Sequence, residues 1–256
     1  MDLFWIKLIL SFITGGVYIA FTIFLSEKFG SKLGGIILGL PSTTLISLIF
    51  IAWSQDMSAV VGALPIIPAA ISLASLFTVV FMMFFKHGIK TAFLVALLIW
   101  AICGLSFIFL EITFFHSIIL AAIIFAAAIL YLQKFPHTKL KKISTSFPEF
   151  FYRSFFAGTV IVISVLMSKF MGPVWGGLFA VFPAAFSSSL FLLSNKYGFN
   201  FTSSVARSMP FGSIGTAVFA LSLYFLILSL EFVPAIIISY VISLLYAIII
   251  YKFYLK

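Results

Sequence analysis

The chain has 256 residues, of which 64% are hydrophobic and only 8% are charged, and its mean hydropathy is +1.30. So few polar groups cannot coat a soluble domain, and lipid must therefore cover most of the outer surface. The formal charge of +9 is a topology signal more than a nucleic-acid footprint, because of where the basic residues lie along the chain.

Apolar stretches near 20 residues long predict an all-α integral membrane protein with nine transmembrane helices. In chain order the predicted helices cover residues 3–25, 33–53, 57–85, 89–110, 112–133, 149–170, 174–194, 200–228 and 232–254. The fourth and fifth helices are divided at Glu111, because one helix from Leu94 to Leu132 would overrun a bilayer.

The basic residues support nine crossings. With nine helices, 13 Lys and Arg residues fall on the face opposite the N-terminus, and only Lys7 and Lys169 fall on the N-terminal face. Basic residues gather on the cytoplasmic side of membrane proteins. The sequence therefore predicts a protein of the cell membrane with an extracytoplasmic N-terminus and a cytoplasmic C-terminus.

An internal repeat appears when the sequence is shifted by 142 positions. Residues 15–41 then align with 157–183 without a gap, and six glycine or proline positions coincide along the two copies. The pairs are Gly16/Gly158, Gly30/Gly172, Gly34/Gly176, Gly35/Gly177, Pro41/Pro183 and Pro68/Pro210. We predict two four-helix repeats, at 1–110 and 149–256, joined by a connecting helix and basic linker at 111–148.

The second repeat must enter the membrane from the opposite side, because an odd number of crossings separates equivalent helices. Inverted repeats suit alternating access, since two near-equal halves that exchange conformations give outward-open and inward-open states of similar energy. The predicted 4+1+4 arrangement is typical of transporters, although some channels and membrane enzymes also contain repeats.

Each repeat carries two glycines, then a proline, then hydroxyl side chains, within a membrane-spanning segment. Proline removes a backbone donor and frees carbonyls of the preceding turn, and nearby hydroxyls can satisfy them. The glycines could instead only pack helices, and the hydroxyls could bond back to their own helix. On the functional interpretation, two broken helices meet near the midplane and bind a substrate or ion. The candidate residues are Gly34, Gly35, Pro41, Ser42, Thr43, Thr44, Gly176, Gly177, Pro183, Ser187 and Ser188.

Arg207 is a further candidate, because an ionisable residue inside the membrane is a functional candidate by default. If it faces a cavity it favours an anionic substrate, and if it reaches the interface it does not. Asp56, Glu111 and Glu231 map to loop edges on the N-terminal face, where a solvated rim is the simpler interpretation; Asp56 could also be a proton-coupling carboxylate.

The single Cys103 and three scattered histidines provide no disulfide framework and no metal-ligand cluster. No catalytic triad or phosphate-binding loop is present, so we expect neither an enzyme nor a cofactor. The expected partners are membrane lipids and a small-molecule substrate or ion, without nucleic acid, and a homodimer remains open.

The C-terminal repeat contains WGGLFAVFPAAFSSSLFLL, with Gly177, Leu178, Phe182, Pro183, Ala184 and Phe186. This pattern resembles the small four-helix GlpM-type membrane proteins (the DUF3147 group). The N-terminal repeat keeps Gly35 and Pro41 but has Leu40 and Ser42 beside the proline, as a diverged copy would. A small unit used singly or as a fused inverted pair is similar in layout to the drug/metabolite transporter superfamily, which is an analogy of fold and does not fix function.

These observations favour a secondary transporter or flippase for a small anionic or lipid-linked substrate. An ion channel is the alternative if the aligned glycines face a continuous pore. A non-transporting assembly or accessory protein is the third hypothesis, consistent with the shortage of charge inside the membrane.

Overall fold

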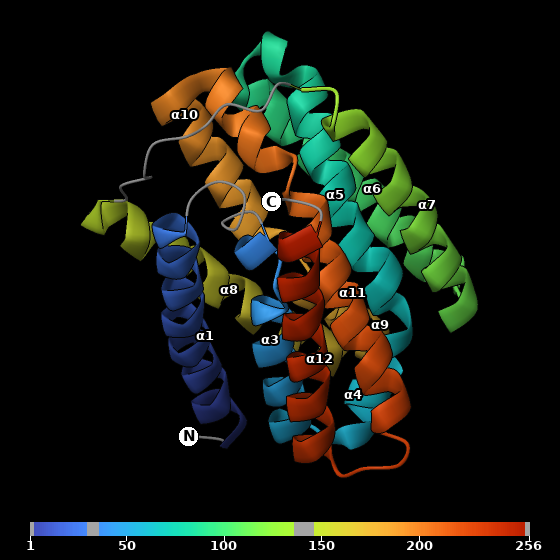
Figure 1. The fold of residues 1–256 in the computed structure, drawn as a ribbon. Coiled ribbons are helices and arrows are strands. Elements are labelled where there is room, and N and C mark those ends of the chain that lie inside the picture. The colour runs from blue at the N-terminus through green and yellow to red at the C-terminus, as the bar shows by residue number, and fades with distance from the viewer. Residues whose placement is uncertain (1–2, 30–35, 136–145, 254–256) are drawn as a thin grey trace.

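The computed structural model describes residues 3–29, 36–135 and 146–253, which form a bundle of helices (Figure 1). Within these residues nine helices are long and apolar enough to cross a membrane and no strand occurs, which confirms the predicted fold class. The helices are α1 (Leu3–Lys28), α3 (Ser42–Ser54), α4 (Met57–Ala63), α5 (Ile67–Phe84), α6 (Ile89–Phe109), α7 (Phe114–Leu132), α8 (Phe147–Met171), α9 (Pro173–Ala180), α10 (Ala184–Ala206), α11 (Met209–Leu226) and α12 (Phe232–Phe253), with 3₁₀ turns η1 (Leu64–Ile66) and η2 (Phe85–His87).

The core of the bundle is built by α5 and α11, which pack on each other and carry the fully buried rings of Phe77, Phe81 and Phe219. The outer helices α1, α6, α7 and α12 expose rows of large apolar side chains such as Leu98 and Ile123. Exposed apolar rows of this size suit contact with acyl chains, as expected of an integral membrane protein.

Each described α-helix of the first repeat has a counterpart 142 residues later. Helix α1 corresponds to α8, α3 to the first arm of α10, α5 to α11 and α6 to α12, and their ends agree within about two residues. The contacts where α1 crosses α8 also come in pairs that are 142 residues apart. A Cβ on Gly16 would lie 3.1 Å from the Ser154 carbonyl oxygen, and one on Gly158 would lie 2.7 Å from that of Phe12. The two glycines therefore let equivalent helices cross in close contact.

The boundary between the seventh and eighth helices differs from the prediction in one respect. Helix α10 continues past residue 194 to Ala206, but Gly198 interrupts it with φ of 72° and ψ of −169°. Glycine adopts a positive φ without the steric cost that a Cβ brings. Two arms of α10 meet at this bend in Figure 1, and the second arm, residues 199–206, is the counterpart of α4. The predicted division at residues 195–199 thus coincides with the bend.

Helix α7, which joins the repeats, contacts an equivalent kink in each of them. Near its start, Ser117 Oγ accepts a hydrogen bond from the Ala69 amide at 2.9 Å and lies 3.4 Å from the Ile66 carbonyl, beside the proline kink between α4 and α5. Just beyond its end, Gln133 binds Arg207 at the corresponding kink before α11. Opposite ends of one helix meet equivalent kinks, as an inverted arrangement requires.

Candidate functional site

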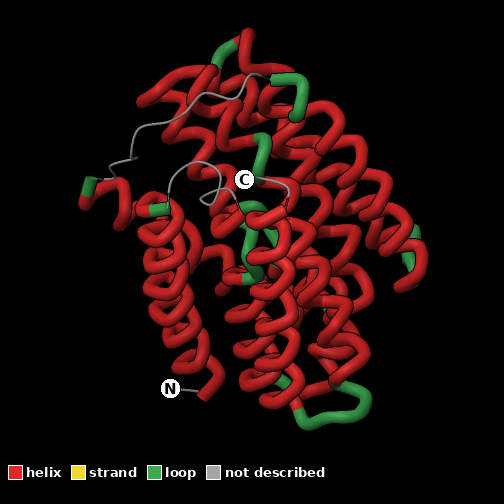
Figure 2. The backbone as a smooth tube through the Cα atoms, in the orientation of Figure 1, coloured by secondary structure: helices red, strands yellow, loops and turns green. Residues whose placement is uncertain are grey.

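Both predicted helix breaks exist and have nearly the same backbone conformation. Pro41 precedes α3 with φ of −71° and ψ of 47°, and Pro183 precedes α10 with φ of −74° and ψ of 51°. Leu45 donates a backbone hydrogen bond to Pro41, and Ser187 donates one to Pro183, each at 2.8 Å. The non-helical segments lie inside the bundle (Figure 2). The proline repeat therefore encodes two copies of one local structure.

Carbonyls released at each break are bound by a threonine of the other repeat. Thr216 Oγ1 donates to the Gly39 carbonyl at 2.7 Å, and Thr44 Oγ1 donates to the Ala180 carbonyl at 3.4 Å. A buried carbonyl without a partner would be costly in a membrane interior. These two bonds tie the broken segments of the repeats together.

The breaks face each other across a small central void of about 20 Å³. Of the candidate residues, Ser42, Thr43, Thr44 and Pro183 line it. Pro41 does not line it, although its neighbour Leu40 does. A void of this size has room for roughly one water molecule. The two breaks thus lie on opposite sides of one small void.

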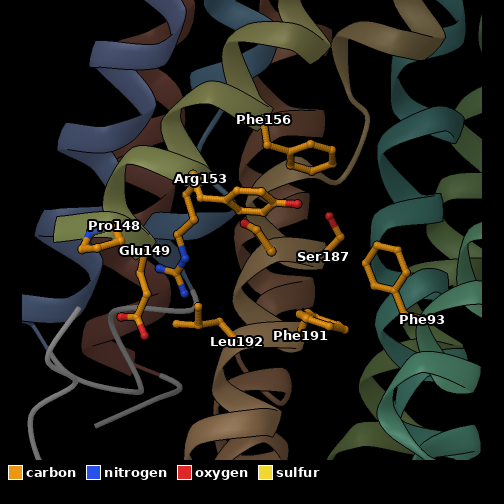
Figure 3. A pocket seen from close by; sticks show the side chains of 10 residues that line it. Phe93, Pro148, Glu149, Arg153, Phe156, Ser187, Phe191 and Leu192 are labelled. Carbon is orange, nitrogen blue, oxygen red and sulfur yellow. The ribbon is translucent and has the colours of Figure 1, made fainter. Parts of the chain in front are cut away.

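Ser187 and Ser188 do not line the central void. They lie on the other side of the first turns of α10, in a separate pocket of about 570 Å³ between α6, α8 and α10 (Figure 3). Both hydroxyls donate to the Ala184 carbonyl of their own helix, at 3.2 and 2.7 Å. We call this cavity the side pocket. Its other lining residues are Phe93, Pro148, Glu149, Tyr152, Arg153, Phe156, Phe191 and Leu192.

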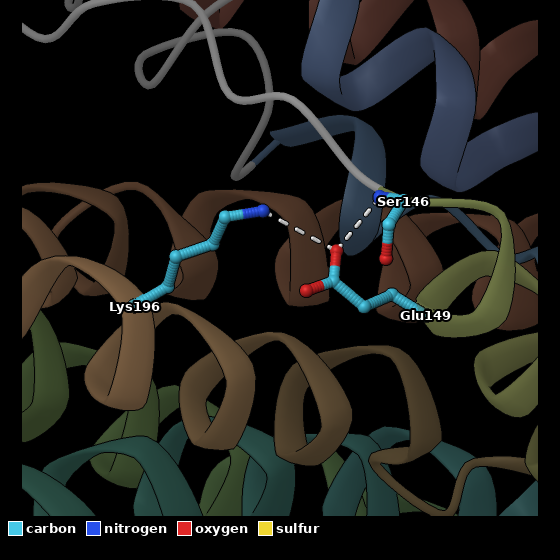
Figure 4. A network of polar contacts seen from close by, with 3 residues as sticks. All are labelled: Ser146, Glu149 and Lys196. Carbon is cyan, nitrogen blue, oxygen red and sulfur yellow. Dashed lines mark hydrogen bonds and ion pairs between the residues drawn. The ribbon is translucent and has the colours of Figure 1, made fainter.

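The side pocket contains the charged residues Glu149 and Arg153, which extend from α8 toward α10 in Figure 3. Arg153 is only 3% exposed. Glu149 Oε2 accepts a hydrogen bond from the Ser146 amide at 2.8 Å and pairs with Lys196 of α10 at 3.4 Å (Figure 4). This ion pair joins the start of α8 to the end of the first arm of α10, at the edge of the pocket.

Aromatic rings separate the side pocket from the central void. The Phe156 ring lines the pocket and lies 6.1 Å from that of Phe182, which lines the void. The Trp100 ring packs edge-on against Phe182 with centroids 4.7 Å apart. Phe156 and Phe182 therefore lie between the two cavities.

The predicted glycine pair of the second repeat packs helices and does not line either cavity. A Cβ on Gly176 would lie 2.4 Å from Ser168 Cβ of α8, and one on Gly177 would lie 2.6 Å from the Ala63 carbonyl oxygen. Helix α9 stays regular through both residues, so they permit close approach and do not make the turn. Their counterparts Gly34 and Gly35 lie outside the described residues.

Arg207 is partly buried and lies away from the central void. Its Nε and Nη2 donate to Gln133 Oε1 at 3.1 and 2.5 Å, and its Nη1 donates to the Phe135 carbonyl at 2.5 Å. The guanidinium thus holds the kink before α11 to the end of α7. This placement gives no support to a role in selecting an anion.

Asp56 has structural partners at the start of α4. Asp56 caps α4, and hydrogen bonds from the Ser58 hydroxyl and the Ala59 amide lower the pKa of its carboxyl group. The Asp56 carboxylate thus serves as the N-terminal cap of α4. Among the described residues, His, Cys, Asp and Glu form no group of three that could hold a metal ion.

Sequence reasoning missed Arg153 and the side pocket. Arg153 lies four residues inside the predicted sixth helix, so the rule that singled out Arg207 applies equally to it. The topology prediction counts Arg153 only among the 13 basic residues of the face opposite the N-terminus. The pocket itself arises from the separation of α6 and α8 across α10, which no local pattern encodes.

Comparison with known proteins places both repeats in one family. The family described as "Protein of unknown function (DUF3147)" matches residues 8–115 and, separately, residues 150–256. No curated protein and no solved structure matches the chain. The two matched segments contain α1 to α6 and α8 to α12, the same halves that the 142-residue shift relates. The chain, which carries this unit twice, therefore belongs to the DUF3147 family.

Proposed function

We propose that the protein is a secondary transporter or flippase that works by alternating access at the crossing of its two broken helices. The observation that carries this proposal is the pair of proline breaks, equivalent in conformation and facing each other across a closed central void. Broken helices that meet at a repeat interface are where transporters bind their substrates.

An asymmetry between the repeats supports the same function. Helix α1 packs extensively on α3, whereas its counterpart α8 is separated from the first arm of α10 by the side pocket. Two halves of similar sequence in different arrangements imply that each arrangement is accessible to the other half. Exchange would close the side pocket and open an equivalent one between α1, α3 and α12.

The proposed orientation follows the basic residues, 13 of which lie on the face opposite the N-terminus. The N-terminus is then extracytoplasmic, the C-terminus cytoplasmic, and the side pocket lies in the cytoplasmic half of the cell membrane. The proposal assigns the chain no enzymatic step and no nucleic-acid partner. The partners are lipids and a small substrate, with a homodimer left open.

The test uses two spin-label pairs related by the 142-residue shift, in a Cys103→Ser background. One pair, at Thr91 and Tyr152, flanks the side pocket, and the other, at Leu10 and Val233, occupies the equivalent exposed positions. Alternating access predicts two distance populations for each pair, with the long distance of one pair accompanying the short distance of the other.

Pro41→Ala and Pro183→Ala should shift or abolish this exchange while the protein stays folded, because each restores a donor that the break removes. Pro234→Ala, at the exposed start of α12, is the matched control. A single unchanging distance for both pairs in folded protein would count against a transporter and favour the channel or accessory hypotheses.

A further inference from the structure

The central void lies at the N-terminal ends of two helices that belong to different repeats. The first residues of α3 and of α10, 42–44 and 184–186, line it. In the first turn of a helix the backbone N–H groups have no acceptor within the helix, and the aligned peptide dipoles leave a partial positive charge there. Two such ends at one void make its potential positive, and no charged side chain lines the void among the described residues. The void therefore favours an anion over a cation.

The hydrogen bonds at the two breaks engage carbonyls and leave amides. The Gly39 and Ala180 carbonyls accept hydrogen bonds from threonines of the other repeat. The Leu40 and Phe182 carbonyls accept from the first amide of α3 and of α10, at 2.6 and 2.7 Å. The amides of the second and third residues of these helices have no backbone acceptor among the described residues. A cation needs oxygen acceptors and an anion needs donors, so this balance also favours an anion.

Two buried hydroxyls without partners lie one helical turn from the void, at equivalent positions of the two repeats. Ser47 of α3 and Ser189 of α10 are 0% and 2% exposed, and neither hydroxyl has a hydrogen-bond partner within the described residues. Each lies three or four positions beyond residues of its own helix that line the void, and therefore on the same helix face. Side chains of an α-helix lean toward its N-terminus, so both hydroxyls lean toward the void. An unpartnered buried hydroxyl is costly, and a ligand that leaves the void along either helix would give it a partner.

We propose that the central void binds one small inorganic anion of halide size, held by the first-turn amides of α3 and α10 and by the hydroxyls of Ser42 and Thr43, which line it. The volume of about 20 Å³ admits roughly one particle of the size of a water molecule, so a lipid head group has no room there in this conformation. Ser47 and Ser189 are then the next partners of the anion on the two sides of the crossing. As cargo, the anion rests on the proposed function, which places the substrate at the same crossing, but its binding does not.

The binding test uses chloride as the probe, with thermal unfolding of the protein in neutral detergent as the readout. Sodium gluconate is exchanged stepwise for sodium chloride at constant sodium concentration and ionic strength. A ligand that binds the folded protein raises the unfolding temperature according to its concentration relative to its dissociation constant. We expect a saturating rise with chloride, and the same rise when choline replaces sodium, because the site selects the anion.

The matched variants are Ser42→Ala, at the void, and Ser106→Ala, on α6. Ser106 Oγ donates to the Ile102 carbonyl of its own helix at 2.8 Å, and Ser106 does not line the void. Ser42→Ala should raise the chloride dissociation constant by about tenfold, the factor expected for loss of one hydrogen bond to a charged ligand. Ser106→Ala should bind chloride as the unaltered protein does.

Three results would overturn the inference: the same unfolding temperature in chloride and in gluconate, a rise that follows sodium instead of chloride, or equal chloride binding by Ser42→Ala. If Ser42→Ala fails to fold, Thr43→Val decides the question, because it removes the second hydroxyl and keeps the branched shape of the side chain. Equal chloride binding by Thr43→Val would then reject the site. Chloride binding without exchange of the spin-label distances would reject transport and keep the site, whereas exchange without chloride binding would reject only this inference.

Discussion

The two repeats share a plan of helices but differ at their outer ends. On the N-terminal face, α1 lies against α3, and Lys7 Nζ donates to the Trp53 carbonyl at 2.5 Å. On the opposite face, α8 and α10 enclose the side pocket and are joined across its edge by Glu149 and Lys196. Position 149 is equivalent to position 7. The same position therefore contacts Trp53 where α1 lies against α3, and Lys196 at the edge of the side pocket between α8 and α10. On the proposed function, these are the two arrangements that the repeats exchange.

The largest expected effect comes from a substitution at the close contact between the first break and α11. Gly39, in the first break, approaches Gly212 so closely that an added Cβ would lie 2.4 Å from its Cα. Gly39→Ala should destabilise the protein by about 1–3 kcal/mol or more, because backbone must move to admit the methyl group. Thermal unfolding in detergent measures the loss.

Gly215→Ala is the matched control for Gly39→Ala, since its Cβ would meet Ser243 Oγ at an ordinary 3.5 Å. The second break has Val181 where the first has Gly39, so only one of the two breaks demands a glycine. Equal stability of Gly39→Ala and Gly215→Ala would contradict the close approach of the first break to α11.

The next comparison concerns the two ends of α7. Arg207→Ala removes three hydrogen bonds from a charged, partly buried group, and because water can replace them in part the net cost should be about 1–2 kcal/mol. Ser117→Ala removes a neutral hydroxyl at the other kink, with an expected cost of about 0.5–1.5 kcal/mol. Chemical denaturation of both variants measures which one loses more free energy of unfolding. Arg207→Lys should recover only part of the loss, because lysine lacks the fork that binds Gln133 and Phe135 together.

Much of this architecture was predictable because its signals are local or periodic. The lengths of the apolar stretches predicted the nine helices, and the alignment of Pro41 with Pro183 predicted both breaks. The meeting of the breaks was predicted only on the functional interpretation of the repeated proline. Side-chain partners were not predictable in the same way, since Arg207 binds residues more than 70 positions away. Hydroxyl residues that follow the two prolines look alike in the sequence but lie on different sides of their helices. Thr44 lines the central void, whereas Ser188 lines the side pocket.

A hydrogen bond between the repeats, which the equivalent pair of positions cannot form, sharpens the comparison further. Tyr18 of α1 and Tyr240 of α12 share a hydrogen bond of 2.7 Å between their hydroxyls, whereas the equivalent positions are Val160 and Leu98. Tyr18→Phe and Tyr240→Phe should each cost about 0.5–1.5 kcal/mol, and the double variant should cost little more than either one. An additive double variant, measured by thermal unfolding, would argue against the bond. Loss of the bond should also favour opening between α1 and α12, seen as a larger long-distance population for the Leu10 and Val233 labels.

The smallest expected effect on stability lies at the edge of the side pocket. The Glu149 and Lys196 side chains are 24% and 34% exposed, so their pairing should contribute only about 0.2–1 kcal/mol. Lys196→Gln should therefore unfold almost as the unaltered protein does. Its effect on the entry of a reagent into the side pocket should be clearer, because the pair joins α8 to α10. We expect Phe191→Cys, in a Cys103→Ser background, to react faster with a thiol reagent when Lys196→Gln is added. Exchanging the charges, with Glu149→Lys and Lys196→Glu together, should restore the slower reaction. Equal rates with the original pair, with Lys196→Gln and with the exchanged charges would mean that this ion pair does not hold α8 to α10.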